Sequence, residues 1–442
     1  MNNTSHAFGG DTSRRKWAII LPACFFMYMI SFFDRVNIGM ALPHITEEMS
    51  LSPVQGGMVG GAFAWGYLIT QLLAGYLSLK FGPRRLIGIA LVLFGAISML
   101  TGLARTYEEL LIIRFLLGVS EGPIYAATSM LLAQWFLKQE RGRAFGIWNL
   151  SVAAGGFLAG PISAAILAHH SWRWMMVFEG LPAWIFCIIW FSAIPKSLES
   201  AKWMAEPDRD RMKKELALEQ AAYTPQDRSS SWVTIFKERS VWFLMLGFAC
   251  SQVVLYGITL WLPTIFKSYA GMSNMTIGLL SGAPFVMAMF GAYYITHRSD
   301  KHNQERRLHA AVPLLIMGGL LVVLALLPTS MLIAHIALIL AVGFIVKMPT
   351  PLMSSYLTEI LPLGKAVSAV GAVIGGGSFL GQLIGPLLVG YFKSVSPGYG
   401  PSFIALGVAA AVGSALLFLA KPGRKTPQPT VVAPAPAGDA AH

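Results

Sequence analysis

Four charged side chains lie inside stretches of the sequence that are otherwise apolar enough to cross a lipid bilayer. Asp34 and Arg35 are neighbours near the end of an apolar segment that begins at Trp17, and Arg114 and Glu121 lie seven residues apart in a later one. Because a helix has 3.6 residues per turn, seven residues return to the same face, so Arg114 and Glu121 can face one cavity. A charge at the bilayer centre costs at least ~2.5 kcal/mol, so such residues usually serve a function. The pattern indicates a pathway for a solute and protons.

Glu121 is placed near the middle of its apolar segment. Removal from water disfavours an ionised carboxylate and a nearby arginine favours it, and this opposition suits a group that exchanges protons near neutral pH. We therefore expect Asp34 and Glu121 to carry protons, and Arg35 and Arg114 to bind an anion. The alternatives are two structural ion pairs, one at the end of the first helix and one between the fourth helix and the first.

Lys347 is the intramembrane charge expected in the second half of the chain, just ahead of Met348 and Pro349. We expect it to bind an anion, and the alternative is an internal pair with Glu359. Aromatic residues in membrane helices serve as packing or interface anchors at least as often as they bind a ligand. With that alternative kept open, the further candidates for the binding site are Asn149, Tyr67, Tyr125, Tyr256, Trp261 and Phe379.

The composition excludes a water-soluble globule. Of 442 residues, 55% are hydrophobic and 12% are charged, and the mean hydropathy is +0.60. Soluble domains are typically ~25% charged. The net charge of +12 is dispersed between apolar segments, which argues against a nucleic-acid surface. The three cysteines have no metal-ligand spacing and no enzyme motif is present, so we expect neither a metal, a cofactor nor an enzyme.

Windows of about twenty apolar residues predict an all-α membrane protein with twelve transmembrane helices in two six-helix bundles. A long polar stretch separates the sixth window from the seventh. The expected spans are 17–38, 55–79, 86–105, 109–136, 142–168, 173–194, 240–266, 274–297, 308–328, 331–358, 366–392 and 399–420.

The distribution of lysine and arginine predicts the orientation. One set of loops, with both ends of the chain and the stretch 195–239, holds nearly all of them, whereas the other side holds Arg105, Arg173, Lys267 and Lys393. Basic loops remain in the cytoplasm. We expect a cytoplasmic N-terminus at 1–16, bundles at 17–194 and 240–420, a cytoplasmic linker at 195–239 with a helix along the membrane surface, and a disordered cytoplasmic tail at 421–442.

The two halves of the chain contain a weak repeat. The run Gly155–Pro161 in the fifth span is echoed by Gly377–Pro386 in the eleventh, and both end in a Gly-Pro pair. Such repetition at half-chain distance is what a duplicated six-helix bundle would leave. Small residues also let membrane helices approach closely, which is the packing explanation of the same glycines.

The loop after the second span resembles the glycine- and arginine-rich loop of the major facilitator superfamily. It contains Gly75, Gly82, Arg84 and Arg85, but Leu79 stands where the family usually has an acidic residue. The related loop after the eighth span keeps Asp300. In the family these loops latch one conformation through charge pairs with neighbouring helices, so the resemblance implies a weak N-terminal latch. A basic loop that only fixes orientation is the alternative.

Three further stretches resemble the anion:cation symporter branch of that superfamily. They are Phe33–Asn37, Arg114–Glu121, and Ser171–Trp174 followed by Glu179–Pro182. The resemblance implies import of an organic carboxylate with protons, using Asp34, Arg35, Arg114 and Glu121. Two polar positions that sugar-acid members use fall at Val152 and Phe379 in an ungapped comparison, which favours an aromatic or smaller carboxylate.

We therefore expect a monomeric secondary transporter in the bacterial inner membrane, which imports an aromatic carboxylate, a dicarboxylate or a sugar acid by proton symport with alternating access. Its partners would be the small organic anion, protons and the lipid bilayer, with no nucleic acid. An efflux antiporter is the alternative within transport, because Gly156–Pro161 partly resembles the antiporter motif. A membrane-embedded sensor or scaffold is the alternative from another class.

Overall fold

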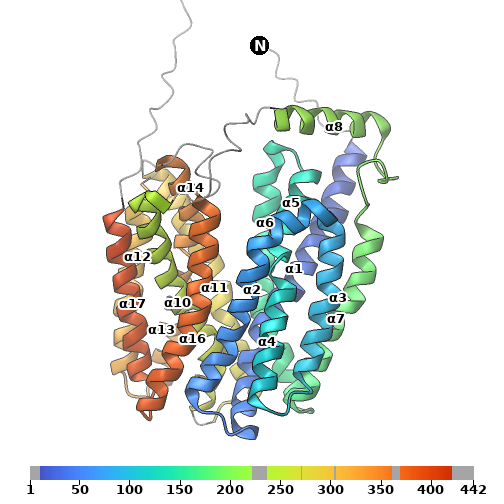
Figure 1. The fold of residues 1–442 in the computed structure, drawn as a ribbon. Coiled ribbons are helices and arrows are strands. Elements are labelled where there is room, and N and C mark those ends of the chain that lie inside the picture. The colour runs from blue at the N-terminus through green and yellow to red at the C-terminus, as the bar shows by residue number, and fades with distance from the viewer. Residues whose placement is uncertain (1–9, 222–235, 270, 303–304, 361–368, 421–442) are drawn as a thin grey trace, which may run out of the picture.

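The computed structural model describes residues 10–221, 236–269, 271–302, 305–360 and 369–420, and these form helices and short connections (Figure 1). Within these ranges, twelve helices or helix pairs are long and apolar enough to cross a membrane. The predicted fold class, an all-α membrane protein of twelve transmembrane helices in two bundles, is confirmed. The tail 421–442 and the first nine residues lie outside the described part of the chain.

The first six spans contain seven helices. The fourth span is a pair of helices, α4 and α5, separated at Gly122 and Pro123. The helices are α1 (Gly10–Glu48), α2 (Pro53–Phe81), α3 (Pro83–Thr101), α4 (Tyr107–Glu121), α5 (Ile124–Trp135), α6 (Lys138–Leu167) and α7 (Trp172–Ala193).

The last six spans follow the same plan. The tenth is broken at Lys347 and Met348, and the eleventh contains one π-helical turn near its start. The elements are α10 (Arg239–Lys267), α11 (Asn274–Lys301), α12 (Arg307–Leu326), α13 (Leu332–Val346), α14 (Pro349–Ile360), η2 (Ala372–Gly376), α16 (Gly377–Val395) and α17 (Gly400–Leu419).

The predicted end of the first span was wrong. We expected it near residue 38, but α1 continues to Glu48, so Asp34 and Arg35 lie inside a long helix and not at its end. The extra turns are apolar through Leu42, and Pro43 lies inside the helix. This depth places both charges in the interior of the bundle.

Local sequence explains several helix boundaries. Ser52 and Gln55 form a reciprocal capping box at the start of α2, and Thr106 and Glu109 form another at the start of α4. These side chains satisfy backbone donors that the first turn of a helix leaves unpaired. Gly82, between α2 and α3, has φ 77°, a left-handed conformation that favours glycine.

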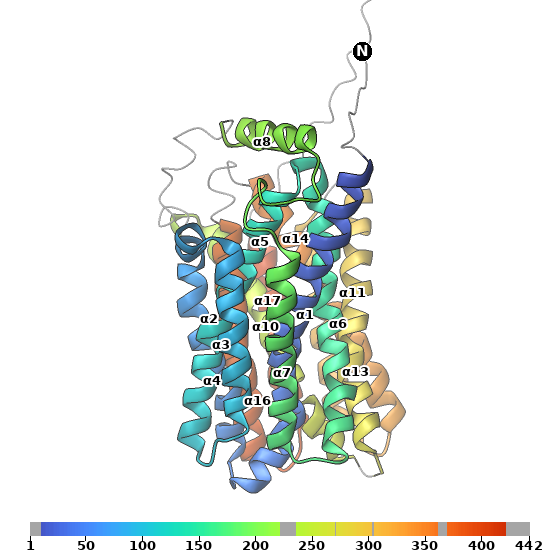
Figure 2. The same ribbon diagram turned by 90° about the vertical axis from the view of Figure 1, so that its right-hand side faces the viewer.

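A polar helix, α8 (Glu206–Ala221), lies across one end of the N-terminal bundle in both views (Figures 1 and 2). Met204 and Met212 are buried against this bundle, and Trp203 stacks on Trp135 with ring centroids 5.8 Å apart. A helix was predicted here and is confirmed, and its position on a membrane surface stays a prediction. We call this the α8 end of the molecule and the opposite end the far end.

The two bundles pack closely toward the far end. A Cβ atom on Gly57 of α2 would lie 2.6 Å from the carbonyl oxygen of Pro386 on α16, and one on Gly160 of α6 would lie 2.0 Å from that of Gly278 on α11. Larger side chains at these two positions would push the backbones apart. One apolar core accordingly runs from the C-terminal bundle into the last turns of α1.

The outer faces of the bundles expose large apolar side chains. Ile333 is 83% exposed, Leu72 is 76% exposed and Ile188 is 75% exposed. Exposed apolar surface of this extent is unfavourable in water and suits contact with lipid. The helices thus bury polar groups inside and present apolar groups outside.

Candidate functional site

The Arg35 guanidinium and the Glu121 carboxylate form an ion pair at the centre of the N-terminal bundle. Arg35 Nε donates to Glu121 Oε2 at 2.7 Å, and Ser31 Oγ donates to the same oxygen at 2.8 Å. Glu121 is fully buried, and its second oxygen, Oε1, has no hydrogen-bond partner among the described residues. The pair joins α1 to α4 at the break that follows Glu121.

Aromatic rings surround the Arg35 guanidinium. Its central carbon lies 4.5 Å from the ring centroid of Tyr67, 5.7 Å from that of Phe63 and 5.8 Å from that of Tyr28. Cation–π attraction at desolvated sites is worth about 2 kcal/mol or more. Tyr67, predicted as a binding residue, therefore supports the arginine directly.

Arg114 is buried, and within the described residues it forms no ion pair. Its guanidinium lies over the Phe63 ring at 5.2 Å, and its Nε makes only a long contact of 3.5 Å with the carbonyl oxygen of Val59. Arg114 and Glu121 do lie on the inner side of α4, as their spacing predicted. A buried guanidinium with unused donors is a strong site for a carboxylate, which it can grip with two parallel hydrogen bonds.

Arg35 and Arg114 line a small cavity between the two halves. Its volume is about 40 Å³, and α1, α2 and α4 form one wall while α10 and α16 form the other. Tyr256 and Gln382 contribute polar groups from the second wall. Small-molecule pockets usually measure about 300–1,000 Å³, so an organic acid can occupy this site only when the walls move apart.

Asp34 lies away from the Arg35–Glu121 pair. Its Oδ1 accepts hydrogen bonds from Ser98 Oγ on α3 and from Asn37 Nδ2 at 3.3 Å, and its Oδ2 has no partner within the described part of the chain. Neighbouring residues on a helix point about 100° apart, so the adjacent Asp34 and Arg35 serve different surroundings.

Glu179 on α7 shares this interior site and was absent from our predicted site residues. Its Oε2 accepts from Asn37 Nδ2 at 2.9 Å and its Oε1 accepts from Ser163 Oγ at 2.6 Å. The signal was present in the sequence, since Glu179 is a carboxylate inside an apolar span and obeys the same rule that identified Asp34.

Lys347 lies at the C-terminal end of α13, where the tenth span is broken. It is half-buried and forms no ion pair or hydrogen bond within the described residues. The alternative pair with Glu359 concerns a side chain outside the described part of the chain. A role in anion binding stays a prediction.

The remaining predicted binding residues lie outside the cavity wall. Asn149 is exposed and donates to the carbonyl oxygen of Phe145 in its own helix. Tyr125 packs on Trp148, and Phe379 packs edge-on against Trp65. Trp261 is buried near the far end and donates to the carbonyl oxygen of Pro386 at 3.0 Å. Contact of these side chains with a substrate stays a prediction.

Gln382 and Ser31 are polar site residues that the sequence reasoning missed. Gln382 lies one turn after Phe379 in α16, and residues three apart share a helix face, so the ungapped comparison missed the amide by one turn. This helix therefore does offer an amide to a hydroxylated substrate. Ser31 precedes Arg35 by one turn and could have been found by the same spacing.

The predicted latch residues form contacts within their own bundles. Arg84 donates to the carbonyl oxygens of Ile194 and Phe191, the latter at 2.6 Å, and so ties α3 to the end of α7. Asp300 pairs with Arg306 at 2.6 Å. Gly75 lies in α2 with open space beside it, Gly82 forms the turn described above and Arg85 is exposed. A latching role stays a prediction.

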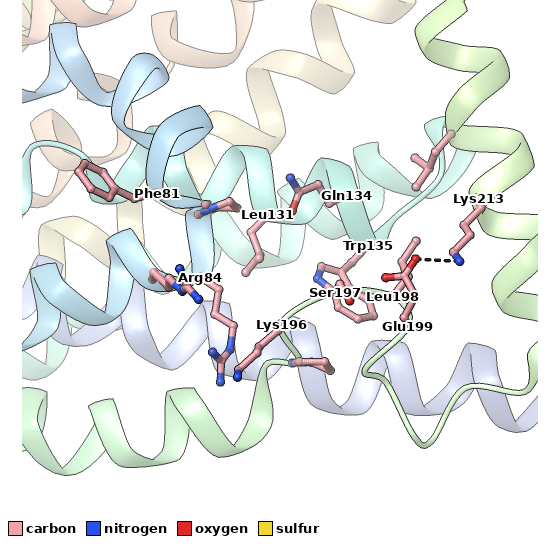
Figure 3. A pocket seen from close by; sticks show the side chains of 15 residues that line it. Phe81, Arg84, Leu131, Gln134, Trp135, Lys196, Ser197, Leu198, Glu199 and Lys213 are labelled. Atoms are coloured by element: carbon pink, nitrogen blue, oxygen red, sulfur yellow. Dashed lines mark ion pairs between the residues drawn. The ribbon is translucent and has the colours of Figure 1, made fainter.

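A larger cavity, of about 580 Å³, lies at the α8 end of the molecule (Figure 3). The loop after α2, the end of α5, residues 195–199 and α8 surround it. Lys213 Nζ lies 2.7 Å from Glu199 Oε1 across this cavity. Its walls contain none of the predicted proton or substrate residues, so we place the functional site between the bundles.

Residues 24–374 match the family model described as the Major Facilitator Superfamily. The "Quinolone resistance transporter" of Acinetobacter baumannii is 27% identical over 418 residues, 93% of this chain and 95% of that protein. The "Inner membrane transport protein RhmT" of Escherichia coli is 28% identical over 428 residues, 93% of this chain and 96% of that protein. The "Hexuronate transporter" of Bacillus subtilis is 26% identical over 274 residues, 61% of this chain and 62% of that protein.

Among solved structures, a bacterial homologue of the human lysosomal transporter Spinster, in an inward-facing and occupied conformation, has a TM-score of 0.74. It is 18% identical, and the similarity covers 91% of this chain and 96% of that one. At this identity the likeness concerns the fold.

Proposed function

The chain belongs to the Major Facilitator Superfamily, and from this premise we propose that it imports an organic carboxylate together with protons by alternating access. The family and the relatives are transporters and not enzymes. Further relatives are named for tartrate, sulfoacetate and L-galactonate, which fits the anion:cation symporter branch. We propose the direction of transport, the coupling to protons and the class of substrate.

Arg114 is the observation that carries the proposal. The Arg114 guanidinium, buried in a membrane bundle, lines a cavity between the halves and forms no ion pair within the described residues. Such a charge is costly unless an anion meets it. We assign the substrate carboxylate to Arg114, opposite the Tyr256 hydroxyl and the Gln382 amide.

Glu121 couples the anion to protons in this proposal. While Glu121 is ionised it occupies Arg35, so that guanidinium is not available to a second anion. Protonation of Glu121 weakens the pair and adds Arg35 to the anion site. Protons therefore favour substrate binding, and by linkage substrate favours proton binding. Asp34, which lies in the adjacent buried site with Asn37 and Glu179, is the second proton carrier.

Alternating access would follow from the close packing toward the far end. We propose that this end is periplasmic and closed here, and that the α8 end is cytoplasmic, as the basic loops predicted. Both termini would then lie in the cytoplasm, with the protein in the bacterial inner membrane. Separation of Gly57 from Pro386 and of Gly160 from Gly278 would open the far end.

The substrate class remains broad. A polar wall that contains Gln382 suits hydroxy acids and sugar acids, and the aromatic surroundings of Arg35 suit a planar acid. A thermal-shift panel of carboxylates on purified protein, including tartrate, hexuronates, sulfoacetate and aromatic acids, would identify the class. We expect stabilisation by at least one carboxylate and none by its amide analogue.

Transport tests the coupling. Protein in liposomes with an acidic exterior should concentrate the carboxylate found by the panel, and a proton ionophore should abolish accumulation without abolishing exchange. Accumulation that survives collapse of the gradient would refute proton symport.

The second candidate is proton-coupled efflux. One relative is named for quinolone resistance, and the small residues of Gly156–Pro161 resemble the antiporter motif. Efflux predicts that the same pH gradient drives the solute in the opposite direction. A sensor or scaffold, the alternative of another class, predicts no flux in either direction.

A further inference from the structure

Two carboxyl groups share a buried site inside the N-terminal bundle, behind the cavity wall. Asp34 is 2% exposed, Glu179 is 4% exposed and Asn37 is 0% exposed. Asn37 Nδ2 donates to one oxygen of each carboxyl group, at 3.3 Å to Asp34 and 2.9 Å to Glu179. One amide thus bridges two acids that belong to α1 and α7.

The other donors to this site are neutral hydroxyl groups. Ser98 on α3 donates to Asp34, and Ser163 on α6 donates to Glu179. No cation forms an ion pair with either carboxyl group within the described residues. Two ionised carboxylates so close together, in a membrane interior and with neutral donors alone, repel each other strongly, and such pairs hold at least one proton.

Charged groups act on the site from two helices. Arg114 on α4 and Arg35 on α1 are the charged groups that act on Asp34 through space, and Asp34 in turn acts on Glu121 and on Glu179. The charged residues of α3 and α6 lie within the first six residues of each helix, and on α7 the only charged residue besides Glu179 is Arg173 at its start.

We propose that Asp34 and Glu179 form a two-carboxyl proton site, bridged by Asn37 and distinct from the Arg35–Glu121 pair, in which Glu179 shares the transported proton. This inference rests on the proposed function and extends it, because that proposal assigned protons to Glu121 and Asp34 but none to Glu179. The unpaired atoms support it. Asp34 Oδ2 and Asn37 Oδ1 both lack partners within the described residues, so Asp34 has an oxygen that can carry a proton and the site retains an unused acceptor.

Arg114 connects this site to the substrate. With one shared proton the two carboxyl groups carry one negative charge, which Arg114 balances. When a substrate carboxylate binds Arg114, the substrate neutralises the guanidinium charge. A second proton on Asp34 and Glu179 then becomes favourable. Neutrality is thus preserved before and after binding, with one proton taken up for each carboxylate bound.

Infrared difference spectroscopy of the purified protein tests the site without substrate or gradient. A protonated carboxyl group has a carbonyl stretch that the ionised form and an amide lack. We expect wild type at neutral pH to show such a band, which Glu179→Gln removes, Asp34→Asn alters and Glu121→Gln leaves in place. Glu179→Asp, which keeps the carboxyl group, should retain a band.

A separate variant tests whether Arg114 balances the charge of the two carboxyl groups. In Arg114→Gln the balancing charge is lost, so the pair should hold a second proton and the band at neutral pH should grow about twofold. Thermal unfolding of each variant checks that it is folded.

Two outcomes would overturn the proposal. One is a wild-type spectrum whose protonated-carboxyl band does not change in Glu179→Gln, and the other is a band that Glu121→Gln alone removes. Neither outcome depends on transport, so proton symport could stand while the paired site fails. Conversely, an intact band with no gradient-driven uptake would retain the site and reject the proposed function.

Discussion

The two halves of the molecule have the same number of spans but very different interiors. In the N-terminal half Asp34, Arg114, Glu121 and Glu179 are all less than 5% exposed. In the described part of the C-terminal half the buried charged side chain is Arg306, which lies next to α12 and pairs with Asp300. The C-terminal wall of the cavity offers the neutral groups of Tyr256 and Gln382.

Under the proposed function, this difference corresponds to a division of labour between the two halves. Charges that bind an anion and exchange protons are costly to bury, and they stabilise one another best within one rigid bundle. The opposite bundle then needs only to close over the bound anion and contribute hydrogen bonds. Lys347 tests this comparison, because it lies at the break in the tenth span. If it binds the anion, the C-terminal half also contributes a functional charge.

The largest expected effect comes from the N-terminal half. Arg114→Ala should weaken carboxylate binding by about 2–5 kcal/mol, the cost of truncating one partner of a buried charge pair. Arg114→Lys should be almost as damaging, because a point charge does not replace a planar fork with two donors. Calorimetry with the carboxylate found by the panel measures both, with the exposed Lys214→Gln as a matched control. A tolerant lysine variant would mean simple charge balance.

Next in size is the loss of coupling in the two proposed proton carriers. Glu121→Gln and Asp34→Asn should each abolish accumulation driven by a pH gradient, since an amide cannot exchange a proton. Counterflow with equal substrate on both sides should survive in at least one of them, which would identify the coupling residue. Accumulation that persists in both variants would show that neither carboxyl group carries the proton.

Lys347 gives a smaller and more selective prediction. If the substrate is a dianion, Lys347→Gln should weaken its binding by about 1.5–3 kcal/mol, the range for hydrogen bonds to charged groups, and a monoanionic analogue should lose much less. Equal losses would assign Lys347 to the general potential of the cavity. No loss for either ligand would place the lysine outside the site and strengthen the contrast between the halves.

The smallest effect is expected at the surface of the N-terminal half. Hydrogen bonds from Lys213 and Ser197 lower the pKa of Glu199 from 4.5 to about 2. Because the folded value lies below the unfolded one, this carboxylate stabilises the fold above about pH 4.5, and the contribution disappears as the pH falls through about 2. Glu199 is exposed, so solvent screens the pair.

Melting temperatures of Glu199→Gln and wild type should therefore differ slightly at neutral pH and converge in acid. A difference that grows as the pH falls would contradict this sign. The contrast with Arg114 is the point of the experiment, since similar charges have large effects inside the bundle and small ones at its surface.

The sequence predicted the spans and the buried charges well, because apolar length and misplaced charge are both local properties. The sequence did not predict which neighbours the Asp34 side chain would contact. Neighbouring residues looked like one pair, but helical rotation sends Arg35 to Glu121 and Asp34 to Asn37. Glu179 required only consistent use of the rule for buried carboxylates. The position of Gln382 in the cavity wall depended on how α10 and α16 pack, which no single-helix pattern contains.

The close packing toward the far end has a consequence for how such a protein diversifies. Gly57 meets a backbone carbonyl of Pro386, and Gly160 meets one of Gly278, so this closure depends on main-chain contact and the absence of side chains. Cavity side chains outside these contacts, such as Gln382, can therefore be replaced over generations without disturbing the close packing, provided that these glycines are retained. Under the proposed function, recognition of the substrate and closure of the far end can thus evolve separately. A directed-evolution library can vary the cavity side chains while the glycines of the far end are kept unchanged.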